Sequence, residues 1–220
     1  MSTIDTASII MAAREQIKHE AAAVLDIADQ VDARFITVAS LIFGSTGKVI
    51  FTGSGTSGFI AQRAAHLFSV TGTPAFALSP GTALHGSMGA IESNDIVIAL
   101  SKGGESTEIN DLCTRVQAIG TTIVALTAKS ESTFGKLADI TITLRNYPAA
   151  DPGNLLAMGS TLAHSAWIDA MAMVLMRANS VSWERIHFMH PGGAVGLLTD
   201  LPAPLEPLTL PALNGDGPSS

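Results

Sequence analysis

The chain has 220 residues, of which 47% are hydrophobic and only 14% are charged, and its formal net charge at pH 7 is −7. This length suits one domain with an additional arm, and the apolar composition favours a homo-oligomer, either a dimer or a tetramer. The negative charge argues against nucleic acid as a partner, and the single cysteine, Cys113, excludes a disulfide framework or a cysteine-based zinc site.

The N-terminal part of the chain predicts a helical arm. Between Ile17 and Ile42, apolar residues recur three, four or seven positions apart, which predicts one long helix or two shorter ones over roughly 4–43. The stretch GSTG at 44–47 ends this pattern. The first residues lack the basic start and the apolar core of a signal peptide, so we expect a cytoplasmic protein.

After the arm, strand-like and helix-like segments alternate. Short runs rich in valine, isoleucine and threonine predict buried strands at 48–52, 74–78, 95–100, 121–127 and 139–144. Helical stretches separate most of these runs. The sequence therefore predicts an α/β fold, a three-layer sandwich in which helices cover both faces of a parallel sheet.

A long apolar helix is predicted over 154–179. Its central part, 155–176, approaches the length of a membrane span. His164 and Asp169 lie in its middle, where a charge would be costly in lipid, so we interpret it as a helix buried in the core or in a subunit interface. We expect no membrane partner, and we expect His164 to be a buried histidine with satisfied hydrogen bonds.

The composition divides the chain into three parts. A helical arm at 1–45 precedes one α/β domain at 46–200. Residues 201–220 are rich in proline, glycine and serine, and they predict a flexible tail.

Two glycine-containing loops follow predicted strands. The first loop, GSGTSG at 53–58, matches the dinucleotide-binding pattern Gly-x-Gly-x-x-Gly. That function also needs an acidic residue about 20 positions further on, but no aspartate or glutamate occurs between Asp32 and Glu92. We therefore expect no cofactor, and an NAD- or FAD-dependent oxidoreductase is the least favoured function.

The second loop, SKGGEST at 101–107, again joins a buried strand to a helix. Ligands of open α/β sheets bind beyond the carboxyl ends of the strands, so both loops could face one ligand. Their hydroxyls and the free N–H groups at the helix starts suit a phosphate dianion. The alternative is that the hydroxyls are helix caps and the glycines are turn residues. The candidate ligand-binding residues are Gly53, Ser54, Gly55, Thr56, Ser57, Ser101, Lys102, Gly104 and Ser106.

Four motifs occur in a characteristic order along the chain. They are GSGTSG, TGTPAFALSPGTALHGSMGAI at 71–91, SKGGESTEI, and HPGGAVG at 190–196. In order and spacing they resemble the sugar isomerase (SIS) domain family, and within it the arabinose-5-phosphate isomerase group, over roughly 10–198. The resemblance implies a flavodoxin-like sandwich with a five-stranded parallel sheet, commonly assembled as a tetramer. It also implies aldose–ketose isomerisation of a phosphosugar through an enediol. Many members carry a C-terminal pair of CBS domains, which we expect this chain to lack.

The chain departs from the family pattern around the expected substrate. Thr56 stands where the family usually has a lysine that contacts the substrate, and Ala149 or Ala150 stands near the position of a family glutamate. The second loop usually reads S-N-S-G-E, so this chain has lost a serine and gained Lys102. We hypothesise that Lys102 supplies the positive charge that is missing at Thr56, because an ammonium group binds phosphate from various directions.

Isomerisation moves a proton between C1 and C2 of the opened sugar, a task that suits histidine near neutral pH. His190 lies at an element boundary, and the resemblance makes it the leading catalytic base, which could reach the site from a neighbouring subunit. His85 is the second candidate and could assist ring opening. Glu105 is either a charge placed against the helix dipole or, as the family implies, an acid/base that contacts the substrate.

Two further alternatives remain open at this point. A metal site built from His85, His187 and His190 is conceivable because imidazole suits zinc or copper, but no spacing enforces it, and the chemistry does not demand a metal. The alternative function is a non-catalytic sensor that binds a phosphosugar. The HPGG motif and Glu105 favour catalysis over sensing.

Overall fold

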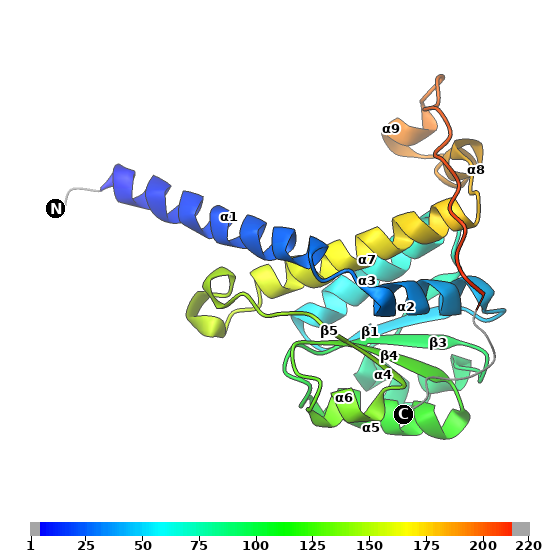
Figure 1. Ribbon diagram of the computed structural model, residues 1–220, viewed down its shortest axis with the longest axis horizontal. Coiled ribbons are helices and arrows are strands. Elements are labelled where there is room, and N and C mark those ends of the chain that lie inside the picture. Colours follow the sequence, from blue (N-terminus) through cyan, green and yellow to red (C-terminus); the bar gives the residue numbers. More distant parts are fainter. Residues whose placement is uncertain (1–4, 213–220) are drawn as a thin grey trace.

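The computed structural model describes residues 5–212 of the chain (Figure 1). All five predicted strands form: β1 (Val49–Gly53), β2 (Ala75–Ala77), β3 (Ile96–Leu100), β4 (Thr122–Thr127) and β5 (Ile140–Thr143). They make one sheet in the order β2-β1-β3-β4-β5, and every neighbouring pair is parallel. This is the flavodoxin-like order of a doubly wound sheet, so the predicted fold class is confirmed.

Helices cover both faces of the sheet (Figure 1). One layer contains α2 (Ala33–Gly44), α3 (Thr56–Val70) and α7 (Gly159–Ala178). The other contains α4 (Pro80–Leu84), α5 (Thr107–Ile119) and α6 (Thr133–Leu137). Short 3-10 turns, η1 (Ser87–Ala90), η2 (Pro148–Ala150) and η3 (Pro152–Asn154), lie in the connections.

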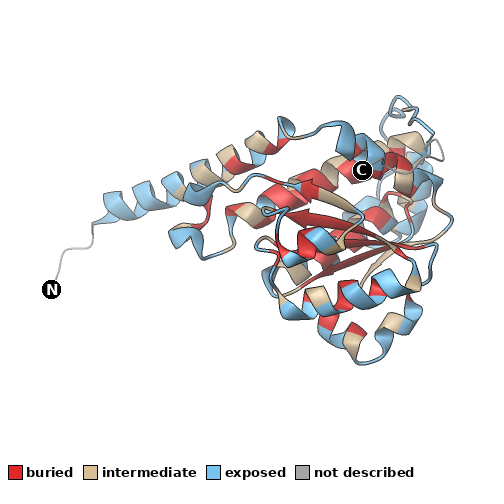
Figure 2. Cartoon of the chain, turned by 60° about the horizontal axis from the view of Figure 1, so that its bottom comes forward, coloured by how far each residue is buried: buried red, intermediate tan, exposed pale blue. Residues whose placement is uncertain are grey.

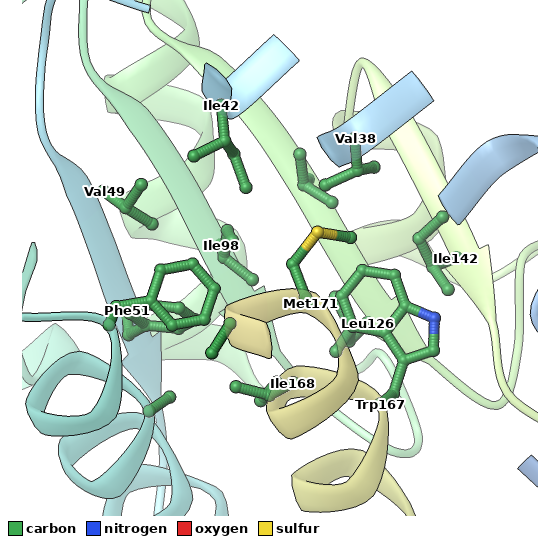
Figure 3. Close-up of a cluster of buried hydrophobic side chains, with 14 of the residues drawn as sticks. Val38, Ile42, Val49, Phe51, Ile98, Leu126, Ile142, Trp167, Ile168 and Met171 are labelled. Atoms are coloured by element: carbon green, nitrogen blue, oxygen red, sulfur yellow. The ribbon is translucent and has the colours of Figure 1, made fainter. Parts of the chain in front are cut away.

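The central strands β1, β3 and β4 are buried, as the red arrows in the middle of the sheet in Figure 2 show. Their side chains enter two cores in alternation. On β3, Ile98 faces the layer of α2, α3 and α7, whereas Val97 faces the layer of α4, α5 and α6. Figure 3 shows the first core, where Trp167 of α7 lies over the sheet. The Trp167 ring meets Phe35 of α2 edge-on, with ring centroids 5.2 Å apart.

Helix α7 confirms the interpretation of the long apolar segment as a core helix. Its buried side chains include Ile168, Met171 and Leu175, and it packs against α1, α2 and α3. Among residues 5–212, no helix is long and apolar enough to cross a membrane.

The predicted arm consists of two helices, α1 (Thr6–Ala28) and α2. Each begins at an aspartate cap, where Asp5 accepts from the Ala7 N–H at 3.1 Å and Asp32 accepts from the Arg34 N–H at 2.9 Å. Helix α2 contributes to the core, whereas α1 projects beyond the sheet and contacts α7 only through its second half (Figure 1).

The chain after α7 forms α8 (Trp183–Met189), α9 (Gly193–Gly196) and an extended segment that returns along α7 (Figure 1). Two carbonyl groups of this segment accept hydrogen bonds from the helices. The Trp183 Nε1–H of α8 donates to the Ala203 carbonyl at 3.0 Å, and the Arg177 Nε–H of α7 donates to the Glu206 carbonyl at 2.7 Å. Leu210 packs against the first core. The predicted tail is therefore held to the domain as far as 212, and its remainder lies outside the described residues.

The single cysteine lies in the second core. Cys113 on α5 has no exposed surface, and burial raises the pKa of its thiol to about 12.

Candidate active site

The two glycine loops lie side by side at the carboxyl edge of the sheet. They follow β1 and β3, which are neighbours at the point where the strand order reverses. The Ser54 hydroxyl in the first loop donates to Glu108 Oε1 at 2.7 Å, and this bond joins the first loop to the first turn of α5. The two loops thus meet as their position in the sequence predicts.

The helices that begin at these loops lack side-chain caps. Aspartate or serine side chains cap α1, α2, α4, α6 and α8. In contrast, Gly55 and Ser106 occupy the N-cap positions of α3 and α5, and no side chain at either position accepts a helix N–H. The first N–H groups of both helices are therefore free of such caps, and an anion would be favoured there by the helix dipoles.

Glycine is required in the first loop for steric and conformational reasons. A Cβ atom on Gly53 would lie 2.7 Å from the Ser57 carbonyl carbon, so this loop closes tightly onto α3. Gly55 has φ of 55°, in the left-handed region that glycine adopts at little cost. The backbone can consequently turn so that the start of α3 faces the space beyond the sheet.

Within the second loop, Ser101 has an internal role. Its side chain is buried, and its hydroxyl oxygen accepts from the Gly104 N–H at 3.2 Å. This bond closes the turn between β3 and α5. The Ser101 hydroxyl can still donate while its oxygen accepts from Gly104, and its predicted contribution to ligand binding stays a proposal.

Lys102 is paired with an acidic residue that the sequence alone did not connect to it. Its Nζ donates to Asp151 Oδ2 at 2.6 Å. Asp151 is fully buried, and its other oxygen accepts from the N–H groups of Met158 at 2.9 Å and Ser160 at 3.0 Å, at the start of α7. Burial alone would raise the pKa of Asp151, but the hydrogen bonds from Lys102 and Ser160 outweigh it and lower that pKa. The Lys102 charge is thus balanced within the protein, and Lys102 ties the second loop to α7.

His164 lies on α7 one turn beyond Ser160, close to this ion pair. Its side chain is buried, as predicted, and burial lowers its pKa to about 4, an effect that Lys102 adds to and Asp151 opposes. The imidazole is therefore neutral at pH 7.

The two glutamates at the start of α5 face different partners. Glu105 accepts from the Thr133 N–H at 3.0 Å, and this bond to the start of α6 lowers the pKa of Glu105. Glu108 instead faces the first loop through Ser54, and the bond from Ser54 lowers its pKa. Glu105 was predicted and Glu108 was not, although the sequence places Glu108 in the first turn of the helix that follows a ligand loop.

His190 lies far from the two loops within one chain. Its ring is 3.0 Å from the Ile186 carbonyl oxygen, at the C-terminal end of α8. Helix α7 starts beside Lys102 and carries the chain about 30 Å along the sheet before α8 begins, at 1.5 Å per residue. Figure 1 shows α8 and α9 at the end of α7 that is remote from η2 and η3. A contribution of His190 to this site would have to come from another copy of the chain.

The remaining candidates do not form a second site within the described residues. His85 is exposed at the C-terminal end of α4. Over residues 5–212, no three or more histidine, cysteine or acidic side chains are grouped to hold a metal, so the conceivable site of His85, His187 and His190 is not assembled in one chain. A cavity of about 610 Å³ lies at the opposite edge of the sheet, and it is lined by none of the predicted ligand-binding residues.

Known proteins resemble this chain over most of its length. A sequence model of the SIS domain family matches residues 42–174, more than half of the chain. The arabinose 5-phosphate isomerase KdsD of Yersinia pestis is 38% identical over 181 residues, which are 82% of this chain and 55% of that protein. The chain spans about half the length of the curated relatives it matches.

Two solved structures share the fold over the whole of their own chains. A candidate sugar-phosphate isomerase from Listeria monocytogenes has a TM-score of 0.80 and 31% identity, covering 86% of this chain and 100% of that one. The Escherichia coli CFT073 protein c3406, solved in complex with arabinose 5-phosphate, has a TM-score of 0.82 and 26% identity, with the same coverage of both chains.

We predict that Asp151→Ala destabilises the protein by about 2–4 kcal/mol, because it removes the cap of α7 and leaves the ammonium of Lys102 partly buried without its partner. Urea unfolding measures this change. Asp169→Ala is the matched control, since Asp169 also lies on α7 and pairs with Arg63 but is exposed, so it should cost less than about 1 kcal/mol. Equal losses in both variants would contradict the structural role of Asp151.

We predict that His164 makes the protein sensitive to acid. Its pKa falls from 6.5 to about 4 on folding, so between these values the unfolded chain binds a proton that the folded chain does not. The free energy of unfolding should therefore decrease as the pH falls from 6.5 to 4, by about 3 kcal/mol in total.

Urea unfolding at several pH values, for the wild type and for His164→Gln, tests this expectation. The variant should lose less stability than the wild type between pH 6.5 and 5. Identical pH dependence in the two proteins would show that His164 does not cause the acid sensitivity.

Proposed function

Because the chain belongs to the SIS domain family, we propose that it is an aldose–ketose isomerase that acts on a phosphosugar, similar to arabinose 5-phosphate isomerase. The observation that carries the proposal is the pair of uncapped N-termini of α3 and α5, side by side at the switch point of the sheet. A phosphate group bound there would accept hydrogen bonds from both helix starts and from nearby hydroxyls. The enzyme name of the Yersinia relative and the ligand of the E. coli structure support this class of substrate.

The reaction requires a base that takes the proton from C2 of the opened aldose while the carbonyl oxygen on C1 gains a proton. The resulting enediol then loses the proton of its C2 hydroxyl and gains one on C1, which gives the ketose. Glu108 is the carboxylate that faces the first loop through Ser54, so we assign the acid/base role at the loops to it. Glu105 remains a candidate, because the Thr133 N–H engages only one of its two carboxylate oxygens.

We propose that His190 completes the site of another copy of the chain. Apolar side chains are exposed around it, including Phe188, which is 80% exposed, and Leu197, which is 82% exposed. Exposed apolar side chains of this size favour a subunit contact, in agreement with the homo-oligomer expected from the composition. His85, which is also exposed, keeps its predicted role in ring opening.

A phosphosugar sensor is the second candidate function. It is favoured by Thr56 and Ala149, which stand where the family has polar side chains, and by the pairing of Lys102 with Asp151. A sensor of this kind would bind the same ligands without moving a proton.

Proton exchange distinguishes the two functions. Pentose and hexose phosphates are incubated with the protein in D₂O and followed by NMR. An isomerase introduces solvent deuterium at C1 or C2 of at least one sugar, and Glu108→Gln should lower this rate by about 100-fold or more. Binding of a sugar phosphate without any exchange would contradict the enzyme and favour the sensor.

A mixing experiment tests whether two copies share one site. His190→Ala and Glu108→Gln should each be nearly inactive, but co-refolded mixtures should recover part of the exchange activity, because some sites then combine an intact His190 with an intact Glu108. His85→Ala mixed with Glu108→Gln provides a comparison for the other candidate histidine. If mixtures of His190→Ala and Glu108→Gln gain nothing over the separate variants, the shared site is wrong.

A further inference from the structure

A small cavity with a mixed polar and apolar lining lies beside Lys102, between the ends of β4 and β5 and the start of α7. Its volume is about 10 Å³, and Lys102, Asn146, Ser160 and His164 contribute the polar part of its lining, with Leu144 and Ala163 among the apolar part. This volume is about the room that one water molecule needs. The cavity is too small for a phosphate group or a sugar ring, so its occupant is not the proposed substrate.

Two buried polar atoms at this cavity lack a protein hydrogen-bond partner. Ser160 Oγ and Asn146 Oδ1 are buried, and neither has a partner with full hydrogen-bond geometry, although the Ser160 hydroxyl lies close enough to Asp151 to help lower the pKa of that carboxylate. His164, which is only 4% exposed, also borders the cavity. Buried polar groups are nearly always hydrogen-bonded to protein or to ordered water, and each group left without a partner costs free energy.

The side chains around these groups already make hydrogen bonds or ion pairs with other residues. Asn146 uses its amide N–H to donate to Asn154 at 2.9 Å, and Lys102 donates to Asp151 at 2.6 Å. Arg145, which also borders the cavity, pairs with Asp26 at 3.0 Å on the outer side. These bonds fix Lys102, Asn146 and Arg145 at the border of the cavity.

We propose that one ordered water molecule occupies this cavity and joins His164, Ser160 and Asn146. Through this water molecule, His164 acts as a positioning residue for the second loop. The water accepts or donates to the neutral imidazole, to the Ser160 hydroxyl and to the Asn146 carbonyl oxygen, which gives it the usual three partners. It fixes the first turn of α7 against the end of β5. Asp151 accepts hydrogen bonds from this first turn and from Lys102. A fixed first turn therefore also fixes the second loop, where the proposed ligand binds.

The structural part of this inference is tested without any ligand. A high-resolution crystal structure of the wild-type protein should contain one water within about 3.2 Å of both Ser160 Oγ and a ring nitrogen of His164. In Ser160→Ala this water should be lost or weakened. An empty cavity in the wild type, or a water that contacts neither side chain, would overturn the proposal.

The positioning role is tested by kinetics, and this arm rests on the proposed function. With the sugar phosphate that exchanges fastest, Ser160→Ala and His164→Leu should raise KM by about threefold to tenfold, as expected for the loss of one hydrogen bond, while kcat changes by less than about twofold. His164→Gln keeps a donor and an acceptor and should restore KM to within about twofold of the wild type.

Ser165→Ala is the matched control, because Ser165 lies on the same helix and its buried hydroxyl donates to the Thr161 carbonyl at 2.9 Å, away from the cavity. It should leave KM unchanged. Equal KM values in Ser160→Ala and Ser165→Ala would overturn the positioning role. If no sugar phosphate is turned over or bound, the proposed function fails, and the crystal structures still decide on the water.

Discussion

Asp151 has no exposed surface, and a carboxylate taken out of water stays ionised only if charge and hydrogen bonds replace its hydration. Its partners come from two places in the chain, the second loop after β3 and the start of α7. The same carboxylate thus caps a 20-residue helix and fixes the loop at which the proposed ligand binds. The geometry of the candidate site depends on this one buried charge more than on any exposed contact.

The pairing of charged side chains at the two loops determines which groups could bind an anion. Lys102 is neutralised by Asp151, and Glu108 brings a negative charge to the first loop. A bound phosphate would therefore depend on backbone N–H groups, helix dipoles and hydroxyls rather than on a free cationic side chain. The hypothesis that Lys102 replaces the family lysine at Thr56 remains a prediction, and in that case the ligand would have to compete with Asp151.

Much of the fold could be predicted because the pattern is local. Short buried strands alternate with helices, and the carboxyl ends of parallel strands share one edge, so the meeting of the two loops follows from the sequence. The remote position of His190 also follows in hindsight, since a helix after the last strand runs antiparallel to the sheet and ends at its other edge. A motif beside a proline and a glycine pair indicates an element boundary but not the edge at which the boundary lies.

Other features of the site could not be predicted from the sequence, because they depend on contacts between residues that are distant in the chain. Lys102 and Asp151 are far apart in the chain, and no spacing rule connects a lysine in a glycine loop with an aspartate before a proline. Glu105 and Glu108 both lie at the start of α5, and only the rotation of that helix against β1 and α6 decides which of them meets the first loop. The sequence also suggested a satisfied His164, but hydrogen bonding of a buried ring depends on neighbours that the helical pattern does not reveal.

The burial of Cys113 gives the native protein a simple chemical property. A thiol with no exposed surface and a pKa of about 12 is almost never a thiolate at neutral pH, and thiolate is the species that reacts with alkylating dyes. The folded chain therefore behaves as if it contained no cysteine. A single cysteine introduced on the exposed part of either loop could carry a fluorophore or spin label without removal of the native residue, which would allow the separation of the loops to be followed in solution.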